Sequence, residues 1–153
     1  MSAPHALRRS LFALLVLAAT ASAASVPGPF LLGAEGWQEA MRRADESGKA
    51  VFVYFYTDWC PYCRQFDAEL VAAPEVDAYL REDIVAVRIN PEAGSAEAEL
   101  ARRYGISGFP ALFVHPRGAL GAPRGIRRTE NGPSGPVLKS PERFLRDLDK
   151  LAG

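Results

Sequence analysis

Hydrophobic residues along this chain form short continuous runs that are separated by amphipathic stretches. Residues 51–56 and 84–89 are rich in β-branched and aromatic side chains and have the length of buried strands. Residues 111–114 form a third run, which follows a proline, and a strand tolerates proline at its first position. The intervening stripes predict helices over residues 37–47, 61–82 with a break at Pro74, and 95–104. Helices that alternate with strands indicate an α/β fold with crossover connections.

The C-terminal third has a weaker pattern. Residues 119–124 predict a last, antiparallel strand that ends at Gly125. Residues 126–139 contain two glycines and two prolines without periodicity, so we expect a long mobile loop there. Ser140 and Pro141 have the residue types of an N-cap and a first helical position. They predict a final helix with Phe144, Leu148 and Leu151 on its buried stripe.

The first 23 residues have the features of a secretory signal peptide. Arg8 and Arg9 precede an apolar run over 11–19, and small residues follow at Ala21 and Ala23. This run is much shorter than the roughly 20 residues that span a bilayer, which argues against a membrane anchor. We therefore expect residues 1–23 to be removed, 24–36 to form an N-terminal arm, and 37–153 to form one domain of a soluble, exported, periplasmic protein.

Composition narrows the possible functions. The chain has 153 residues, of which 48% are hydrophobic, enough for one domain with a substantial core. Its formal net charge is zero, and no basic patch alternates with aromatic residues. Nucleic acid is therefore not an expected partner.

Cys60 and Cys63 are the only cysteines, and they lie where a predicted strand leads into a predicted helix. Pro61 occupies a position near the helix start that proline favours. Unpaired N–H groups at such a terminus stabilise a thiolate, and one helical turn brings the second sulfur within reach of the first. A purely structural disulfide is less favoured, because so short a loop constrains the unfolded chain little. The spacing therefore predicts thiol–disulfide exchange.

The motif Trp59-Cys60-Pro61-Tyr62-Cys63 stands between a predicted strand and a predicted helix, and Gly108-Phe109-Pro110 follows much later in the chain. This combination resembles the thioredoxin superfamily over residues 37–151. Among exported members, the pattern is most similar to the C-terminal domain of the thiol:disulfide interchange protein DsbD. The resemblance implies a three-layer α/β/α sandwich with a central mixed sheet, and no cofactor. It also implies a cis peptide bond before Pro110, and a Phe109 backbone that pairs with an extended substrate by strand addition. Substrate would then be bound by Trp59, Pro61, Tyr62, Phe109 and Pro110.

The resemblance further implies that Cys60 is an exposed attacking thiol and Cys63 a buried resolving thiol. One position departs from the family: Tyr54 stands where thioredoxins and the DsbD domain have a buried aspartate that accepts the proton of the resolving thiol. Tyrosine, with a pKa near ~10, is a poor base at neutral pH. The sequence leaves three alternatives: Asp58 accepts the proton, water accepts it, or resolution is slower.

Only 45 residues lie between Cys63 and Phe109 (109 − 63 − 1), too few for the helical insertion of oxidants of the DsbA type, so we expect a reductase. Its partners would be disulfides of exported proteins and a membrane-embedded electron donor of the DsbD or CcdA type, and the protein would be a monomer.

Two alternatives stay open: a non-catalytic binding module that uses the Phe109 edge, and a metallochaperone with Cys60, Cys63 and His115 as ligands. Because His115 follows a predicted strand next to a proline, we expect it to be solvated, and we expect no metal site.

Overall fold

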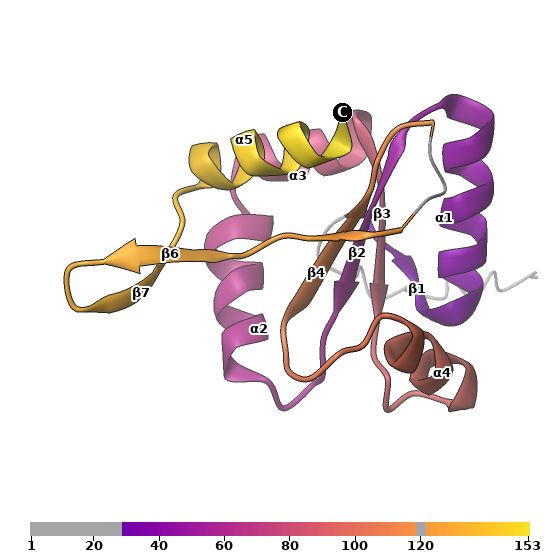
Figure 1. The fold of residues 1–153 in the computed structure, drawn as a ribbon, viewed down its shortest axis with the longest axis horizontal. Helices are drawn as coiled ribbons and strands as arrows, with labels where there is room; N and C mark the ends of the chain where they lie inside the picture. Colours follow the sequence, from indigo (N-terminus) through magenta and orange to yellow (C-terminus); the bar gives the residue numbers. More distant parts are fainter. Residues whose placement is uncertain (1–28, 119–121) are drawn as a thin grey trace, which may run out of the picture.

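The computed structural model describes residues 29–118 and 122–153, in which a five-stranded sheet forms the centre of the molecule (Figure 1). The strand order is β1 (Leu31–Leu32), β3 (Ile84–Ile89), β2 (Ala50–Phe55), β4 (Ala111–His115) and β5 (Arg124–Gly125). The first three strands in this order are parallel, whereas β4 is antiparallel to β2 and β5 is antiparallel to β4. The predicted α/β fold with a central mixed sheet is therefore confirmed.

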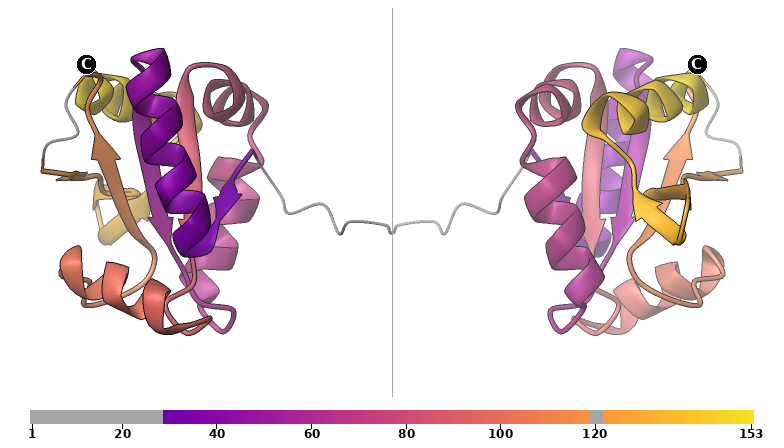
Figure 2. Two further views of the ribbon diagram at one scale, coloured as in Figure 1. Left: turned by 90° about the vertical axis from the view of Figure 1, so that its right-hand side faces the viewer. Right: turned by 90° about the vertical axis from the view of Figure 1, so that its left-hand side faces the viewer.

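Helices cover both faces of the sheet, and two views at right angles to Figure 1 show the resulting three layers (Figure 2). One face packs against α1 (Gly33–Ser47) and α4 (Ser95–Arg103). The other packs against α2 (Pro61–Phe66), the π-helical turn η1 (Asp67–Val71), α3 (Pro74–Glu82) and α5 (Pro141–Ala152). Every residue of β2 is buried, because a strand between two helical layers has no solvent face.

Local signals explain where several helices begin and end. Gly48 has φ 69°, a left-handed conformation that suits glycine, and its N–H donates to the carbonyl of Ala44 to close α1. Pro74 is the first residue of α3, and this position confirms the predicted break. The Ser140 side chain accepts a hydrogen bond from the Arg143 N–H, as an N-cap residue does. Phe144 and Leu148 on α5 are fully buried, while Leu151 is half-buried.

Some boundaries differ from the predictions. Helix α1 begins at Gly33, inside the segment expected to be an N-terminal arm. The predicted strand over residues 119–124 is represented by the two-residue β5, and residues 119–121 lie outside the described part of the chain. The π-turn at 67–71 was not predicted, since sequence periodicity over five residues does not distinguish it from α-helix. The predicted signal peptide also lies outside the described residues.

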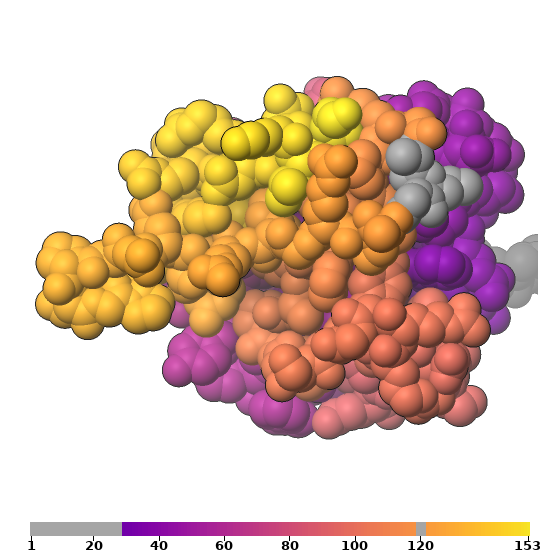
Figure 3. Space-filling view, viewed as in Figure 1, coloured from indigo at the N-terminus to yellow at the C-terminus, as the bar shows by residue number. Residues whose placement is uncertain are grey.

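The prediction of a loop over residues 126–139 is wrong. This segment contains β6 (Thr129–Gly132) and β7 (Gly135–Leu138), which pair antiparallel as a hairpin. Figures 1 and 3 show the hairpin projecting from the body of the molecule. Neither strand contains a buried residue, since β6 is mostly half-buried and β7 is mostly exposed, so neither carries the alternation of buried and exposed residues that predicts a strand. In the described ranges, no helix is long and apolar enough to cross a membrane.

Candidate active site

The two cysteines lie at the start of α2, just beyond the C-terminal end of β2, and are joined by a disulfide. Cys60 is the N-cap residue of α2 and Pro61 is its first residue. The backbone N–H of Cys63 donates to the Cys60 sulfur at 3.1 Å. A hydrogen bond to this sulfur favours its anionic form, so the helix start is arranged to stabilise a Cys60 thiolate.

Exposure does not separate the two cysteines in this disulfide form. Cys60 is 2% exposed and Cys63 is 1% exposed, so the expectation of an exposed Cys60 is not met. What distinguishes them is the surface beside them. Both belong to the cluster that is buried against the sheet, but Cys60 lines an open groove and Cys63, one turn further along α2, does not.

The groove beside Cys60 has a volume of about 520 Å³ and is built from two segments far apart in the sequence. Its lining residues are Trp59, Cys60, Pro61 and Tyr62 from the start of α2, and residues 106–109 from the loop before β4. Trp59 is 61% exposed and its ring meets the ring of Phe109 edge-on, with centroids 6.1 Å apart. The Trp59 indole N–H donates to Glu92 at 3.0 Å, which holds the ring over the groove.

The structure therefore brings most of the predicted substrate-binding residues together. Pro110 is the exception among them, since it does not line the groove and lies directly before β4. The peptide bond between Phe109 and Pro110 is cis. The backbone N–H and C=O of Phe109 make no hydrogen bond within the described part of the chain. Such free backbone groups at a groove are available to an extended peptide.

The segment that leads into the β6–β7 hairpin, which the sequence analysis missed, contacts one of the residues that line the groove. The guanidinium of Arg128, one residue before β6, lies 4.9 Å from the centre of the Tyr62 ring. The carbonyl of Arg128 accepts a hydrogen bond from the Lys139 N–H at 2.9 Å, which continues the hairpin ladder and fixes the position of Arg128. The turn prolines and glycines between residues 132 and 136 were the only sequence signal of a hairpin.

On the sheet side of the disulfide lies a group of polar side chains. The Tyr54 hydroxyl donates to the carbonyl oxygen of Cys63 at 3.4 Å. Burial raises the pKa of this tyrosine, and the nearby Asp67 carboxylate raises it further. Tyr54 is therefore neutral at physiological pH and cannot act as a base. Asp58, the predicted proton acceptor, is exposed and accepts a hydrogen bond from the Asn90 amide at 3.4 Å.

Arg88 and Asp67 form a buried ion pair next to Tyr54. The side chain of Arg88 is 8% exposed, and its Nη2 lies 3.4 Å from Oδ2 of Asp67. Its guanidinium carbon is 3.9 Å from the centre of the Tyr56 ring, 5.2 Å from Tyr54 and 5.7 Å from Phe30. Burial raises the pKa of Asp67, while the positive charge of Arg88 opposes that rise.

His115 does not belong to this site. It pairs with Val51 at the opposite end of β2 from the cysteines, whereas Phe55 pairs with Ala111. Four residues of strand separate the two ends, or roughly 13 Å at 3.3 Å per residue. His115 is also buried and lies 2.6 Å from the Tyr104 hydroxyl, so the expectation that it is solvated is wrong. The described residues contain no group of three or more His, Cys, Asp or Glu placed to hold a metal ion.

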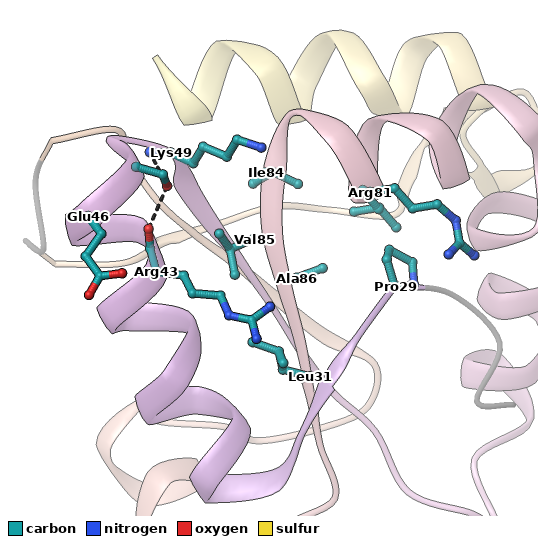
Figure 4. Close-up of a pocket in the computed structure, with 11 residues that line it drawn as sticks. Pro29, Leu31, Arg43, Glu46, Lys49, Arg81, Ile84, Val85 and Ala86 are labelled. Atoms are coloured by element: carbon teal, nitrogen blue, oxygen red, sulfur yellow. Dashed lines mark hydrogen bonds between the residues drawn. The ribbon is translucent and has the colours of Figure 1, made fainter. Parts of the chain in front are cut away.

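A second hollow, of about 370 Å³, lies at the end of the sheet remote from the cysteines (Figure 4). It is lined by residues from α1, the start of β3 and the end of α3. Its cationic side chains already have partners: Arg43 binds Glu39, Arg81 binds Asp77 and the Lys49 amine binds the carbonyl of Glu82. No cysteine lines this hollow, so it is separate from the candidate active site.

Comparison with known proteins agrees with this geometry. The family model of the thioredoxin-like domain matches residues 37–126, which include both cysteines and the Phe109–Pro110 pair. Protein disulfide-isomerase 5-2 of Arabidopsis thaliana is 37% identical over 68 residues, or 44% of this chain and 15% of that protein. Thiol:disulfide interchange protein DsbD 2 of Pseudomonas aeruginosa is 34% identical over 77 residues, or 49% of this chain and 13% of that protein.

A solved structure shows the same fold over a larger part of the chain. The oxidised C-terminal domain of DsbD from Neisseria meningitidis superposes with a TM-score of 0.57 at 23% identity, covering 80% of this chain and 98% of that domain. The chain spans less than a fifth of the length of the two curated relatives, so the similarity concerns one domain of each. By its matched family model and by this fold, the chain belongs to the thioredoxin-like domain family.

Proposed function

We propose that this protein is a thiol–disulfide oxidoreductase that reduces disulfides in exported proteins. The observation that carries the proposal is the Cys60–Cys63 disulfide at the start of α2, with Cys60 lining a groove opposite Phe109. A redox-active pair has to be reachable by a second disulfide, and this groove provides the access. The names of the curated relatives, a protein disulfide-isomerase and a thiol:disulfide interchange protein, support the same chemistry.

In the proposed reaction, the thiolate of Cys60 attacks one sulfur of a client disulfide. A mixed disulfide forms between Cys60 and the client, and the other client sulfur leaves as a thiolate. The sulfur of Cys63 then attacks Cys60 and releases the second client thiolate. Two electrons pass to the client, and the protein is left with the Cys60–Cys63 disulfide. During the exchange, the client backbone pairs with Phe109 and its side chains contact Trp59 and Tyr62.

The compact connection between the two halves of the site favours reduction over oxidation. Between Cys63 and Phe109 the chain contains only η1, α3, β3 and α4 with their short connections. This leaves no room for the helical insertion that the thioredoxin resemblance associates with oxidants of the DsbA type. A reductase in an oxidising compartment needs a supply of electrons, and we propose a membrane-embedded donor of the DsbD or CcdA type.

The redox potential of the Cys60–Cys63 pair tests the direction. The mature protein is equilibrated with dithiothreitol or glutathione buffers, and its reduced fraction is measured by alkylation and mass spectrometry. A reductase is expected to have a potential near the thioredoxin value of about −270 mV, whereas a value near about −120 mV would indicate an oxidant. Failure of the reduced protein to reduce insulin would instead favour the non-catalytic binding module.

Export is tested independently of the chemistry. The full chain is expressed in a Gram-negative host, and the N-terminus of the protein from the periplasmic fraction is sequenced. We expect the mature chain to start at Ala24, after the small residues that end the apolar run. An unprocessed chain that remains in the cytosol would contradict the proposed location.

A further inference from the structure

The resolving step of the proposed function needs a group that accepts the proton of Cys63, and the family's usual aspartate is absent. Tyr54 occupies its position, and the structure keeps this tyrosine neutral by burial. Asp58, the alternative from the sequence, is exposed and turned toward Asn90. Neither residue meets the requirement for a base within reach of the buried Cys63 thiol.

Asp67 lies in the required place. It is four residues after Cys63, and its backbone N–H donates to the Cys63 carbonyl, so the two residues are one helical turn apart. Side chains at this spacing lie on the same helix face, with Cβ atoms roughly 5–6 Å apart. Helical side chains also lean toward the N-terminus, which directs the Asp67 carboxylate back toward Cys63.

The Asp67 carboxylate interacts with Arg88 and with the Tyr54 hydroxyl, and both interactions lower its pKa against the effect of burial. Its Oδ2 is paired with Arg88 Nη2 at 3.4 Å, and the side chain is 24% exposed. Its Oδ1 is buried and accepts no hydrogen bond from the residues that the structure describes. A buried acceptor without a partner is costly, so its persistence calls for an explanation. The π-helical turn begins at this same residue, and such turns occur frequently at functional sites.

We propose that Asp67 receives the proton of Cys63 during resolution of the mixed disulfide. As the proton moves to the carboxylate, the Cys63 sulfur attacks Cys60 and the Cys60–Cys63 bond forms. The bond between Cys60 and the client breaks, the client sulfur leaves with the electron pair, and the proton on Asp67 passes to this thiolate or to solvent. Atoms and charge balance without any further reagent.

Arg88 is a positioning residue for this carboxylate. Its positive charge lowers the pKa of Asp67 against the larger effect of burial, which raises it, and the Phe30, Tyr54 and Tyr56 rings hold the guanidinium in place. The polar and charged groups that act on Asp67 are Arg88 and Tyr54, both from the sheet. Helices α3 and α5, which also pack on η1, contribute apolar residues to this cluster, among them Val76, Phe144 and Leu148.

The two steps of the reaction can be separated with dithiobis(nitrobenzoate), a small aromatic disulfide. When the reduced mature protein is mixed with it in a stopped-flow instrument, attack by Cys60 releases one thionitrobenzoate. Attack by Cys63 on the mixed disulfide then releases a second. The Cys63→Ser variant is expected to release only the first, which identifies the two phases.

The variants compared are Asp67→Asn and Asp67→Glu, with Glu69→Gln as a matched control because Glu69 is an exposed carboxylate on the same turn.

We expect Asp67→Asn to slow the second phase by about 10²-fold at neutral pH, the usual contribution of a general base, and to leave the first phase unchanged. Asp67→Glu should restore part of the rate, and Glu69→Gln should match the wild type. In the wild type, the second-phase rate should level off once Asp67 is ionised. In Asp67→Asn it should keep rising up to the pKa of Cys63 itself, and this profile separates a proton acceptor from a residue that only maintains the fold.

The same experiment distinguishes failure of the inference from failure of the proposed function. An equal second phase in Asp67→Asn and wild type, or equal slowing by Glu69→Gln, overturns the role of Asp67. A slower second phase in Asp58→Asn with no effect of Asp67→Asn would assign the proton to Asp58 instead. If the wild-type protein releases no thionitrobenzoate, the proposed redox function itself is wrong. If Asp67→Asn does not fold, the pH dependence of the second phase in the wild type provides the test. A second-phase rate that never levels off as the pH rises overturns the proposal.

Discussion

The guanidinium of Arg88 lies 3.4 Å from the carboxylate of Asp67 and joins strand β3 to the π-helical turn η1, which continues the helix of the cysteines. Both groups lie on the inner side of that helix, and Arg88 is almost completely buried. Breaking a buried pair by removing one partner leaves the other charge uncompensated. The pair should therefore influence both the stability of the protein and the chemistry of Cys63.

Replacement of Arg88 by methionine should move the pH dependence of resolution. Arg88 lowers the pKa of Asp67, so its removal raises that pKa and leaves more of the carboxyl protonated at neutral pH. We expect the second thionitrobenzoate phase to slow at neutral pH and to level off at a higher pH than in the wild type. The control is Arg81→Met, which removes an exposed arginine paired with Asp77. A pH profile that is the same in all three proteins would contradict this role of Arg88.

The pH dependence of stability should also report on Asp67. Its pKa is higher in the folded protein than in the unfolded chain, so the folded state holds the proton more tightly. Between about pH 4, the unfolded value, and the folded pKa, its contribution to the free energy of unfolding falls as pH rises. In Asp67→Asn this decline should be absent. In the wild type it amounts to about 1.4 kcal/mol for each unit by which the folded pKa exceeds the unfolded pKa, before solvent screening. Denaturant titrations of both proteins across this range provide the test, and parallel curves would contradict it.

Truncation of Trp59 to alanine should weaken binding of protein clients and leave the thiol chemistry intact. The ring is exposed and lies against Phe109 at the groove. We expect KM for insulin to rise about tenfold, which corresponds to about 1.4 kcal/mol of lost contact, with the first thionitrobenzoate phase unchanged. Leu32→Ala, which truncates another exposed apolar residue that lies outside the groove, is the control. Equal effects of the two variants would mean that Trp59 has no special role in binding.

Replacement of Arg128 by alanine should likewise affect only large substrates. Its guanidinium stacks on the Tyr62 ring and connects the β6–β7 hairpin with the groove. Exposed stacking of this kind contributes about 0.5–1 kcal/mol, so we expect a several-fold rise in KM for insulin. Lysine at this position should restore the charge but not the planar stacking. The neighbouring exposed Arg127 provides the control variant, and an equal effect of Arg127→Ala would argue against a specific role of the contact between Arg128 and Tyr62.

Tyr104 should matter for stability and not for redox chemistry. Its hydroxyl accepts a hydrogen bond from the Trp37 indole at 2.8 Å and lies 2.6 Å from the His115 ring. Tyr104→Phe removes one hydrogen-bond partner from the Trp37 indole and from the His115 ring, which are partly buried. This loss should lower the free energy of unfolding by about 1–3 kcal/mol. Denaturant unfolding should show this loss, while both thionitrobenzoate phases keep their rates. A change in either phase would connect His115 with the cysteines after all.

Much of the fold followed from local patterns. The strand Ile84–Ile89 has the predicted bounds, β2 is shifted by one residue at both ends, and β4 is one residue longer than predicted. These segments are buried between two helical layers, so hydrophobicity and β-branching identify them without reference to the rest of the chain. The helix ends at Gly48, Pro74 and Ser140 were predictable for a similar reason, since capping depends on a few adjacent residues.

The hairpin and His115 show where local patterns are insufficient. The strands of the hairpin contain no buried residue and pair only with each other, so their side chains carry no periodic signal. His115 was expected to be solvated because it follows a strand and precedes a proline. Tyr104, eleven residues earlier in the sequence, packs against it and completes a polar contact inside the protein.

By itself, the sequence determined the fold family, the pair of sulfur atoms and their place at a helix start. Each of these depends on residues that are neighbours along the chain, because strand propensity, helix capping and a two-residue cysteine spacing are local properties. Only the tertiary structure decided which charged groups surround Cys63. Asp67 and Arg88 are 21 residues apart, and each resembles an ordinary surface charge in the sequence. Folding of the helix onto the sheet excludes most of the water around them, and this burial gives their pairing its effect on proton transfer.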